Sequence, residues 1–326
     1  MDEQAGGRRP VRGSPGRHEL RPAGGRAPVV VGVDGSAAAL DAVEWAAAEA
    51  AARHCPLHVV HVLTWPVVID PAGIVAGASL YAHQAAAEQV VDEAVVRARV
   101  VASDVRVVPR LVTGSAGPVL VEQAVDAGLL VLGHGSRRSS RRLRRSINVR
   151  VITQATCPVA VVKPFRIMST APAAAWVVVG VDGSAHSAAA VGFAYQAAAQ
   201  RGIGLRAIHP WSPRGVVDHR GVATDVADAE KAERRVLHQA LTGWRSKFPE
   251  VPVEARLVRD SSGRALLNGS AGAALTVVGS NKHDPVGGRM PEGVIQTLIR
   301  NARSPVAVIH PRTMTVPQGH RSVRPV

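Results

Sequence analysis

Two segments in the first half of the chain carry residue types that contact ribose and phosphate groups. Asp34, Gly35 and Ser36 directly follow the apolar run Val29–Val33, and residues 133–146 read GHGSRRSSRRLRRS. A carboxylate at the end of a strand can accept hydrogen bonds from a ribose hydroxyl or a base amine, while glycines and arginines suit phosphate oxygens. Asp34 has a second interpretation, an Asx turn that starts the next helix. The sequence leaves both interpretations open.

The first of these segments belongs to an internal repeat. The residues VVVGVDGSA at 29–37 recur letter for letter at 177–185, so Asp182, Gly183 and Ser184 repeat the first turn. A period of this length indicates two copies of one domain. The expected division is a disordered basic tail at 1–27, a first domain at 28–164, a linker at 165–175, a second domain at 176–311 and a disordered tail at 312–326.

Strand and helix patterns alternate along each copy. In copy 1, Val29–Val33 is a continuous β-branched run, as in a strand buried on both faces, and Ser36 is placed to cap an Ala-rich helix. This alternation predicts an α/β fold with an open, doubly wound parallel sheet of five strands in each domain. The further elements expected in copy 1 are strands at 57–63, 105–112, 129–133 and 159–163, and helices near 83–102, at 117–127 and at 147–154; copy 2 repeats this order, with its long helix near 224–247.

Composition narrows the class of protein. The chain is 46% hydrophobic, has no apolar run long enough to span a bilayer, and begins without an apolar signal segment. A cytoplasmic protein is therefore expected, with no membrane association. Its two cysteines, Cys55 and Cys157, lie far apart without CxxC spacing, which predicts two buried or half-buried thiols and neither a disulfide framework nor a zinc site.

The net charge of +14 is concentrated in three places. Residues 1–27 carry six Arg and three acids, residues 312–326 carry three Arg and no acid, and six arginines lie between Arg137 and Arg145. The remaining residues are nearly neutral. The basic charge therefore belongs to two tails and one loop, and such runs are most often solvated segments.

Catalytic signatures are missing from the sequence. It contains no GxSxG elbow, no HExxH pair and no GxxxxGK[ST] loop. His61 and His209 occupy the same position in the second strand of each copy, where a packed structural role is expected. The sequence therefore predicts a protein that is not an enzyme, with slow hydrolysis of a bound nucleotide left open.

The repeated VVVGVDGS, the late LLVLGHGS and LTVVGSNK segments, and the terminal CPVAVVKP and SPVAVIHP strands resemble the universal stress protein family. The resemblance is to the tandem-domain form common in actinobacteria, and it covers roughly residues 28–164 and 176–311. It implies two Rossmann-like domains, paired within the chain as a pseudo-dimer about a local two-fold axis. It also implies that the terminal strands mediate association, including homo-oligomers.

The family's nucleotide-binding members hold ATP through three elements, which the resemblance places on this chain. They are the Asp after the first strand, the residue after the His of the second strand, and a loop of form G-x-x-G-x(9)-G-[S/T]. The implied contacts in the first domain are Asp34, Gly35, Ser36, Val62, Gly133, Gly135, Ser136, Arg145 and Ser146; weaker equivalents in the second domain are Asp182, Gly183, Ser184 and Gly279.

Both copies depart from the family's loop. Copy 1 has Arg145 where the last glycine belongs, so phosphate would be held by guanidinium groups instead of a glycine cradle. In copy 2, Lys282 replaces the second glycine, Glu292 and Gly293 replace the final G-[S/T] pair, and Pro210 replaces Val62. A carboxylate at the phosphate end repels the ligand, so ATP binding is expected in domain 1 and is expected to be degenerate in domain 2.

The expected function is that of a non-catalytic, nucleotide-responsive stress protein with ATP as its ligand; a Mg²⁺ ion accompanying ATP stays open, and no metal site is identified. The alternative is a structural module that binds partners and no nucleotide. Association with nucleic acid through Arg137–Arg145 is disfavoured, because the loop has no aromatic residue for stacking and the chain has no helix-turn-helix or RRM signature.

Overall fold

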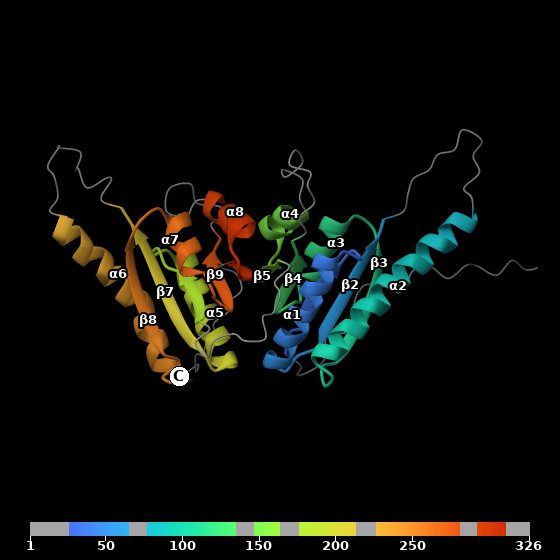
Figure 1. The fold of residues 1–326 in the computed structure, drawn as a ribbon, viewed down its shortest axis with the longest axis horizontal. Coiled ribbons are helices and arrows are strands. Elements are labelled where there is room, and N and C mark those ends of the chain that lie inside the picture. The colour runs from blue at the N-terminus through green and yellow to red at the C-terminus, as the bar shows by residue number, and fades with distance from the viewer. Residues whose placement is uncertain are drawn as a thin grey trace, which may run out of the picture.

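The computed structural model describes residues 26–64, 77–134, 147–163, 176–212, 226–280 and 292–310. They form two repeats of the same order of elements (Figure 1). Repeat 1 comprises β1 (Val29–Val33), α1 (Ala37–Arg53), β2 (Leu57–Leu63), α2 (Gly77–Val101), β3 (Val107–Thr113), α3 (Ala116–Gln123), β4 (Leu129–Gly133), α4 (Ile147–Gln154) and β5 (Val159–Val162). Repeat 2 comprises β6 (Trp176–Gly180), α5 (Ala185–Arg201), β7 (Gly204–Trp211), α6 (Val226–Lys247), β8 (Val253–Arg259), α7 (Ser262–Gly269), β9 (Leu275–Gly279), α8 (Glu292–Asn301) and β10 (Val306–Ile309).

The strands of each repeat form a five-stranded parallel sheet, which confirms the predicted fold class. The full strand order is β3-β2-β1-β4-β5-β10-β9-β6-β7-β8. In repeat 1 the central strand β1 pairs with β2 on one side and β4 on the other, with Val29 opposite both Leu57 and Leu129. The chain therefore leaves β1 in one direction and later returns on its other side. Such a reversal of strand order creates a crevice at the carboxyl ends of the central strands.

The two sheets join through their last strands into one ten-stranded sheet. β5 and β10 are antiparallel, and Ala160 lies opposite Ala307. These two alanines hold equivalent positions in the two repeats, so the pairing is symmetric about them. The repeats are thus related by a local two-fold axis at this junction.

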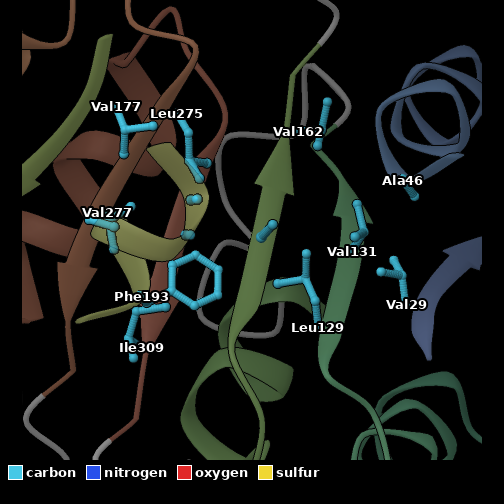
Figure 2. Close-up of a cluster of buried hydrophobic side chains, with 14 of the residues drawn as sticks. Val29, Ala46, Leu129, Val131, Val162, Val177, Phe193, Leu275, Val277 and Ile309 are labelled. Atoms are coloured by element: carbon cyan, nitrogen blue, oxygen red, sulfur yellow. The ribbon is translucent and has the colours of Figure 1, made fainter. Parts of the chain in front are cut away.

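Helices cover both faces of the sheet. The helices α1, α2, α5 and α6 pack on one face and contribute to one hydrophobic core that runs through both repeats. Figure 2 shows residues of this core from both sides of the junction, with Phe193 beside Ile309. The helices α3, α4, α7 and α8 cover the opposite face over a second core. Because side chains alternate along a strand, Val29 and Val31 face the first core and Val30 the second.

Two expected helix boundaries are wrong. α2 begins at Gly77 instead of near 83, because no Gly or Pro follows Gly77 to interrupt the helix before Val101. α3 ends at Gln123 instead of 127, because the amides of Val125 and Ala127 donate to carbonyls three residues earlier, in tight turns that end the helix. The prediction for the two cysteines is confirmed, since Cys55 and Cys157 are both buried and neither forms a disulfide. Within the described ranges no helix has the length and apolar character to cross a membrane.

Candidate functional site

The turn after β1 holds Asp34 by one of its two carboxylate oxygens. Oδ1 of Asp34 accepts hydrogen bonds from the Ser36 amide at 3.0 Å and from the Ser36 hydroxyl at 2.6 Å. Gly35 has a φ of +77°, a value that L side chains rarely adopt. The Ser36 hydroxyl in turn accepts from the Ala39 amide at 3.2 Å, which caps α1. The Asx-turn interpretation of Asp34 is therefore confirmed.

The turn after β6 has the same geometry. Oδ1 of Asp182 accepts from the Ser184 amide at 2.9 Å and from its hydroxyl at 2.6 Å, and Gly183 has a φ of +79°. The Ser184 hydroxyl caps α5 by accepting from the Ser187 amide at 3.2 Å. Among the described residues, Oδ2 of Asp34 and Oδ2 of Asp182 have no hydrogen bond. Each turn therefore uses one carboxylate oxygen and leaves the other available to a ligand.

The predicted site residues of repeat 1 that the structure describes lie at one edge of the sheet. Asp34 follows the carboxyl end of β1, Val62 is the second-last residue of β2, and Gly133 ends β4. Asp34 is exposed and Val62 half-buried. Three parallel neighbours thus present these residues at the crevice beside β1. The other predicted contacts of repeat 1 lie outside the described residues; they are Gly135, Ser136, Arg145 and Ser146.

The glycines that end β4 and β9 are required by packing. A Cβ on Gly133 would lie 2.4 Å from the Ala38 carbonyl oxygen, and one on Gly279 would lie 2.6 Å from the His186 carbonyl oxygen. Both oxygens belong to the backbone of the first turn of α1 or α5, which cannot give way as a side chain can. Asn148 of α4 also donates from Nδ2 to the Gly133 carbonyl at 3.2 Å. The presence of glycine at these positions is therefore explained without a ligand.

A groove of about 380 Å³ lies beside the turn of repeat 2, between the start of α5 and the side of α6. It is lined by Asp182, Gly183, Ser184, Ser187, Ala188, Val236, Gln239 and Ala240. In repeat 1, Val90 of α2 takes the place of Val236, since each valine lies against the glycine of its own turn.

The two strand histidines differ in their partners. His61 Nδ1 lies 2.8 Å from the Val33 carbonyl oxygen, and His209 Nδ1 lies 2.7 Å from the Val181 carbonyl oxygen. Each ring thereby ties the second strand of its repeat to the end of the first. The predicted packing role of both histidines is thus supported by geometry. Among the described residues, His209 alone of the two makes a second ring contact, in which Nε2 lies 2.7 Å from Oε2 of Glu233 on α6.

Glu233 is a site difference that sequence reasoning missed. It lies three residues before Val236, on the same face of α6, and its carboxylate contacts His209 of β7. Counting back three residues from Val90 places Ala87 at the equivalent position of repeat 1, where it is buried. Aligning α2 and α6 on Val90 and Val236 would have shown this difference, because the sequence has Glu233 in one helix and Ala87 in the other.

The end of β4 lies in a cationic environment. Burial lowers the pKa of His134, and the positive charges of Lys163 and Arg300 lower it further. Lys163 also donates from Nζ to the Ala302 carbonyl at the end of α8, 3.0 Å away, so this environment includes groups of both repeats. In repeat 2 the equivalent residue, directly after β9, is Ser280. The loop that follows β4 therefore starts where positive charge favours an anion.

Metal binding has no support in the described part of the chain, where no group of three or more His, Cys, Asp or Glu side chains could hold an ion.

Comparisons with known proteins place the chain among its relatives. The model of the universal stress protein family matches residues 26–163 and again residues 176–310. A universal stress protein of Mycobacterium tuberculosis (strain H37Rv) is 35% identical over 289 residues, which cover 86% of this chain and 95% of that protein. A second universal stress protein of that strain is 31% identical over 309 residues, covering 89% and 97%.

The fold also has a solved counterpart. The crystal structure of a universal stress protein from Archaeoglobus fulgidus superimposes with a TM-score of 0.65, covering 87% of this chain and 98% of that one. Its sequence identity is 16%, so this likeness shows the fold alone.

Proposed function

Because the chain belongs to the universal stress protein family, we propose that it is a non-catalytic protein that responds to ATP and binds it in repeat 1. The observation that carries the proposal is the hydrogen bonding of the Asp34 carboxylate. Its Oδ1 is held rigidly by Ser36 at the crevice of the sheet, while Oδ2 has no hydrogen bond among the described residues. A fixed acceptor at that place suits a ribose hydroxyl or a base amine.

Electrostatics favours repeat 1 over repeat 2 as the nucleotide site. Lys163 and Arg300 place positive charge near the end of β4, where the phosphate loop of repeat 1 begins. In repeat 2 the helix beside the groove carries Glu233, which is paired with His209, whereas repeat 1 has Ala87 at the equivalent position. Polyphosphate carries negative charge, so the positive charge at the end of β4 attracts it to repeat 1.

The second strand adds a further difference. Pro210 has no backbone N–H, so a main-chain contact to the base through that donor is confined to Val62 in repeat 1. Within the loop after β4, Arg145 and Ser146 are proposed to contact phosphate oxygens, with Gly135 and Ser136 at its start. Guanidinium groups bind such oxygens with two parallel hydrogen bonds, which compensates for the missing glycine.

The response to ATP follows from differential affinity. A ligand shifts a protein between two states only by as much as it binds one of them more tightly. The site lies beside α1 and β4, which both contact the junction between the repeats. ATP is therefore proposed to favour one arrangement or assembly of the chain, with no chemical step required.

Isothermal titration of ATP into the full chain tests this proposal. Asp34→Asn and Asp182→Asn form a matched pair, because an asparagine oxygen can still make the Asx turn while its amide group cannot accept a bond in place of Oδ2. Wild type and Asp182→Asn are expected to release the same heat, and Asp34→Asn is expected to release none. Equal heats from both variants would contradict the assignment to repeat 1, and an absence of heat in the wild type would refute ATP binding.

A further inference from the structure

Among the described residues, the junction between the repeats contains one buried carboxylate, that of Glu49 near the end of α1. Its side chain is only 2% exposed. Oε1 accepts from Nε of Arg53 at 2.6 Å within the same helix, and Oε2 accepts from Nη2 of Arg201 on α5 of the other repeat. Both arginine side chains are 17% exposed. Glu49 therefore bridges the two repeats through a charge that has almost no access to water.

The two arginines are the same residue of the repeat. α1 and α5 are each 17 residues long, and Arg53 and Arg201 are their last residues. By the same alignment, the counterpart of Glu49 is Ala197, which is 1% exposed. Nη1 of Arg201 donates to the backbone oxygen of Ala197 at 2.9 Å, so this arginine lies along its own helix while reaching the carboxylate of the other. The local two-fold axis thus relates two arginines but only one acid.

Further contacts hold the arginines in this place. The guanidinium of Arg53 lies over the ring of Phe193 on α5, 5.1 Å from its centroid, which is a second contact across the junction. Nη1 of Arg26 donates to the Arg53 carbonyl at 2.7 Å and adds another cation nearby. In the described part of the chain, Glu49 is the only carboxylate within salt-bridge distance of Arg53 or Arg201. The cluster therefore depends on one acid.

Without the carboxylate of Glu49, the positive charges of Arg53 and Arg201 repel each other. Burial lowers the pKa of Arg201 and the charge of Arg53 lowers it further, while Glu49 acts in the opposite direction. An arginine stays protonated in proteins, so it cannot relieve such a conflict by losing its proton. Removing one partner of a buried ion pair leaves an uncompensated buried charge, which is strongly destabilising.

We propose that Glu49 makes the junction selective, so that the α5 face of repeat 2 accepts the α1 face of repeat 1 and rejects a second α5 face. Two α5 faces would bring together two Arg201 side chains and two Ala197 side chains, with no carboxylate between them. Two α1 faces would carry two arginines and two acids, and would be balanced. The partner that fits repeat 2 is therefore repeat 1, in the same chain or in a second copy.

Substitutions in the full chain reproduce each of these charge sets. Glu49→Ala leaves two arginines and no acid, as in a pairing of two α5 faces. Ala197→Glu leaves two arginines and two acids, as in a pairing of two α1 faces. The double variant Glu49→Ala/Ala197→Glu moves the single acid to the symmetric position. Glu44→Ala is the matched control, because Glu44 pairs with Arg97 inside repeat 1.

Hydrogen exchange of the β5 and β10 amides reports opening of the junction directly, since these strands pair across it. Glu49→Ala is expected to speed this exchange by roughly a hundredfold or more, from the usual effect of breaking a buried ion pair. Glu44→Ala is expected to stay within about tenfold of the wild type, because it keeps Glu49 between the arginines. Ala197→Glu and the double variant are expected to exchange more slowly than Glu49→Ala, because each supplies an acid, although the added side chain at buried Ala197 costs some packing.

A triple variant, Glu49→Met/Arg53→Met/Arg201→Met, separates charge from shape. Apolar residues of similar volume commonly replace a buried ionic cluster without loss of stability, so slow exchange is expected to return. Slow exchange in either the double or the triple variant, combined with fast exchange in Glu49→Ala, supports the proposal. It is overturned if Glu49→Ala exchanges no faster than Glu44→Ala, or if neither the double nor the triple variant slows the exchange.

Discussion

Gly133 offers a test of whether packing or phosphate binding requires glycine at the end of β4. In Gly133→Ala the added methyl group would lie 2.4 Å from the Ala38 carbonyl oxygen, about 1 Å inside an ordinary contact. The obstacle is the backbone of α1, so strand and helix must separate. Overpacking of this kind costs about 3 kcal/mol in free energy of unfolding. The loss is expected in the complete absence of nucleotide.

Urea unfolding of the nucleotide-free chain measures this loss, and Gly243→Ala is the control with the same chemical change. Gly243 is exposed in the interior of α6, and a Cβ there meets nothing within 4 Å. Alanine is the better helix former, so this variant is expected to gain about 1 kcal/mol. The reasoning is refuted if Gly133→Ala is as stable as the wild type without nucleotide and fails only in ATP binding. That result would make Gly133 a phosphate-loop glycine alone.

Two further predictions concern buried titratable groups. Burial, together with the positive charges of Arg110 and Arg106, lowers the pKa of His58 to about 4, so the folded state keeps the ring neutral above that pH. The unfolded chain takes up that proton below about pH 6.5, so the free energy of unfolding should fall as the pH drops from 6.5 to 4. His58→Gln should flatten this decline in urea titrations at several pH values, and an unchanged slope would contradict it. Cys55 and Cys157 should react with a thiol reagent only after unfolding, because both are buried and burial raises the pKa of the Cys55 thiol; prompt labelling of native protein would disprove this.

The parts of the fold that depend on residues adjacent in the sequence could be predicted. The turn at Asp34 depends on a glycine and a serine that follow it directly, and its Asx geometry was one of two stated interpretations. The strands were evident from apolar runs such as Val29–Val33, and the parallel sheet from the alternation of strands and helices. The early start of α2 at Gly77 was missed because helix ends depend on weak local preferences.

The features that depend on distant residues could not be predicted. Gly133 suggested a phosphate loop, but its Cβ position lies against the backbone of α1, almost a hundred residues earlier. Glu49 is one of several acids in the Ala-rich helix α1, and its partner Arg201 lies 152 residues further along the chain. Glu233 meets His209 only when α6 packs beside the second strand of repeat 2. Sequence pattern identifies which residues are available to such sites, but packing decides which of them meet.

The central claim is that ATP binds in repeat 1, and photoaffinity labelling of the full chain tests it most directly. An azido analogue of ATP is bound and irradiated, and mass spectrometry of the digested protein then locates the labelled peptides. The account predicts label on peptides between residues 28 and 164, abolished by excess unlabelled ATP and by Asp34→Asn. Competable label confined to peptides between 176 and 311, or an absence of competable label, would contradict it.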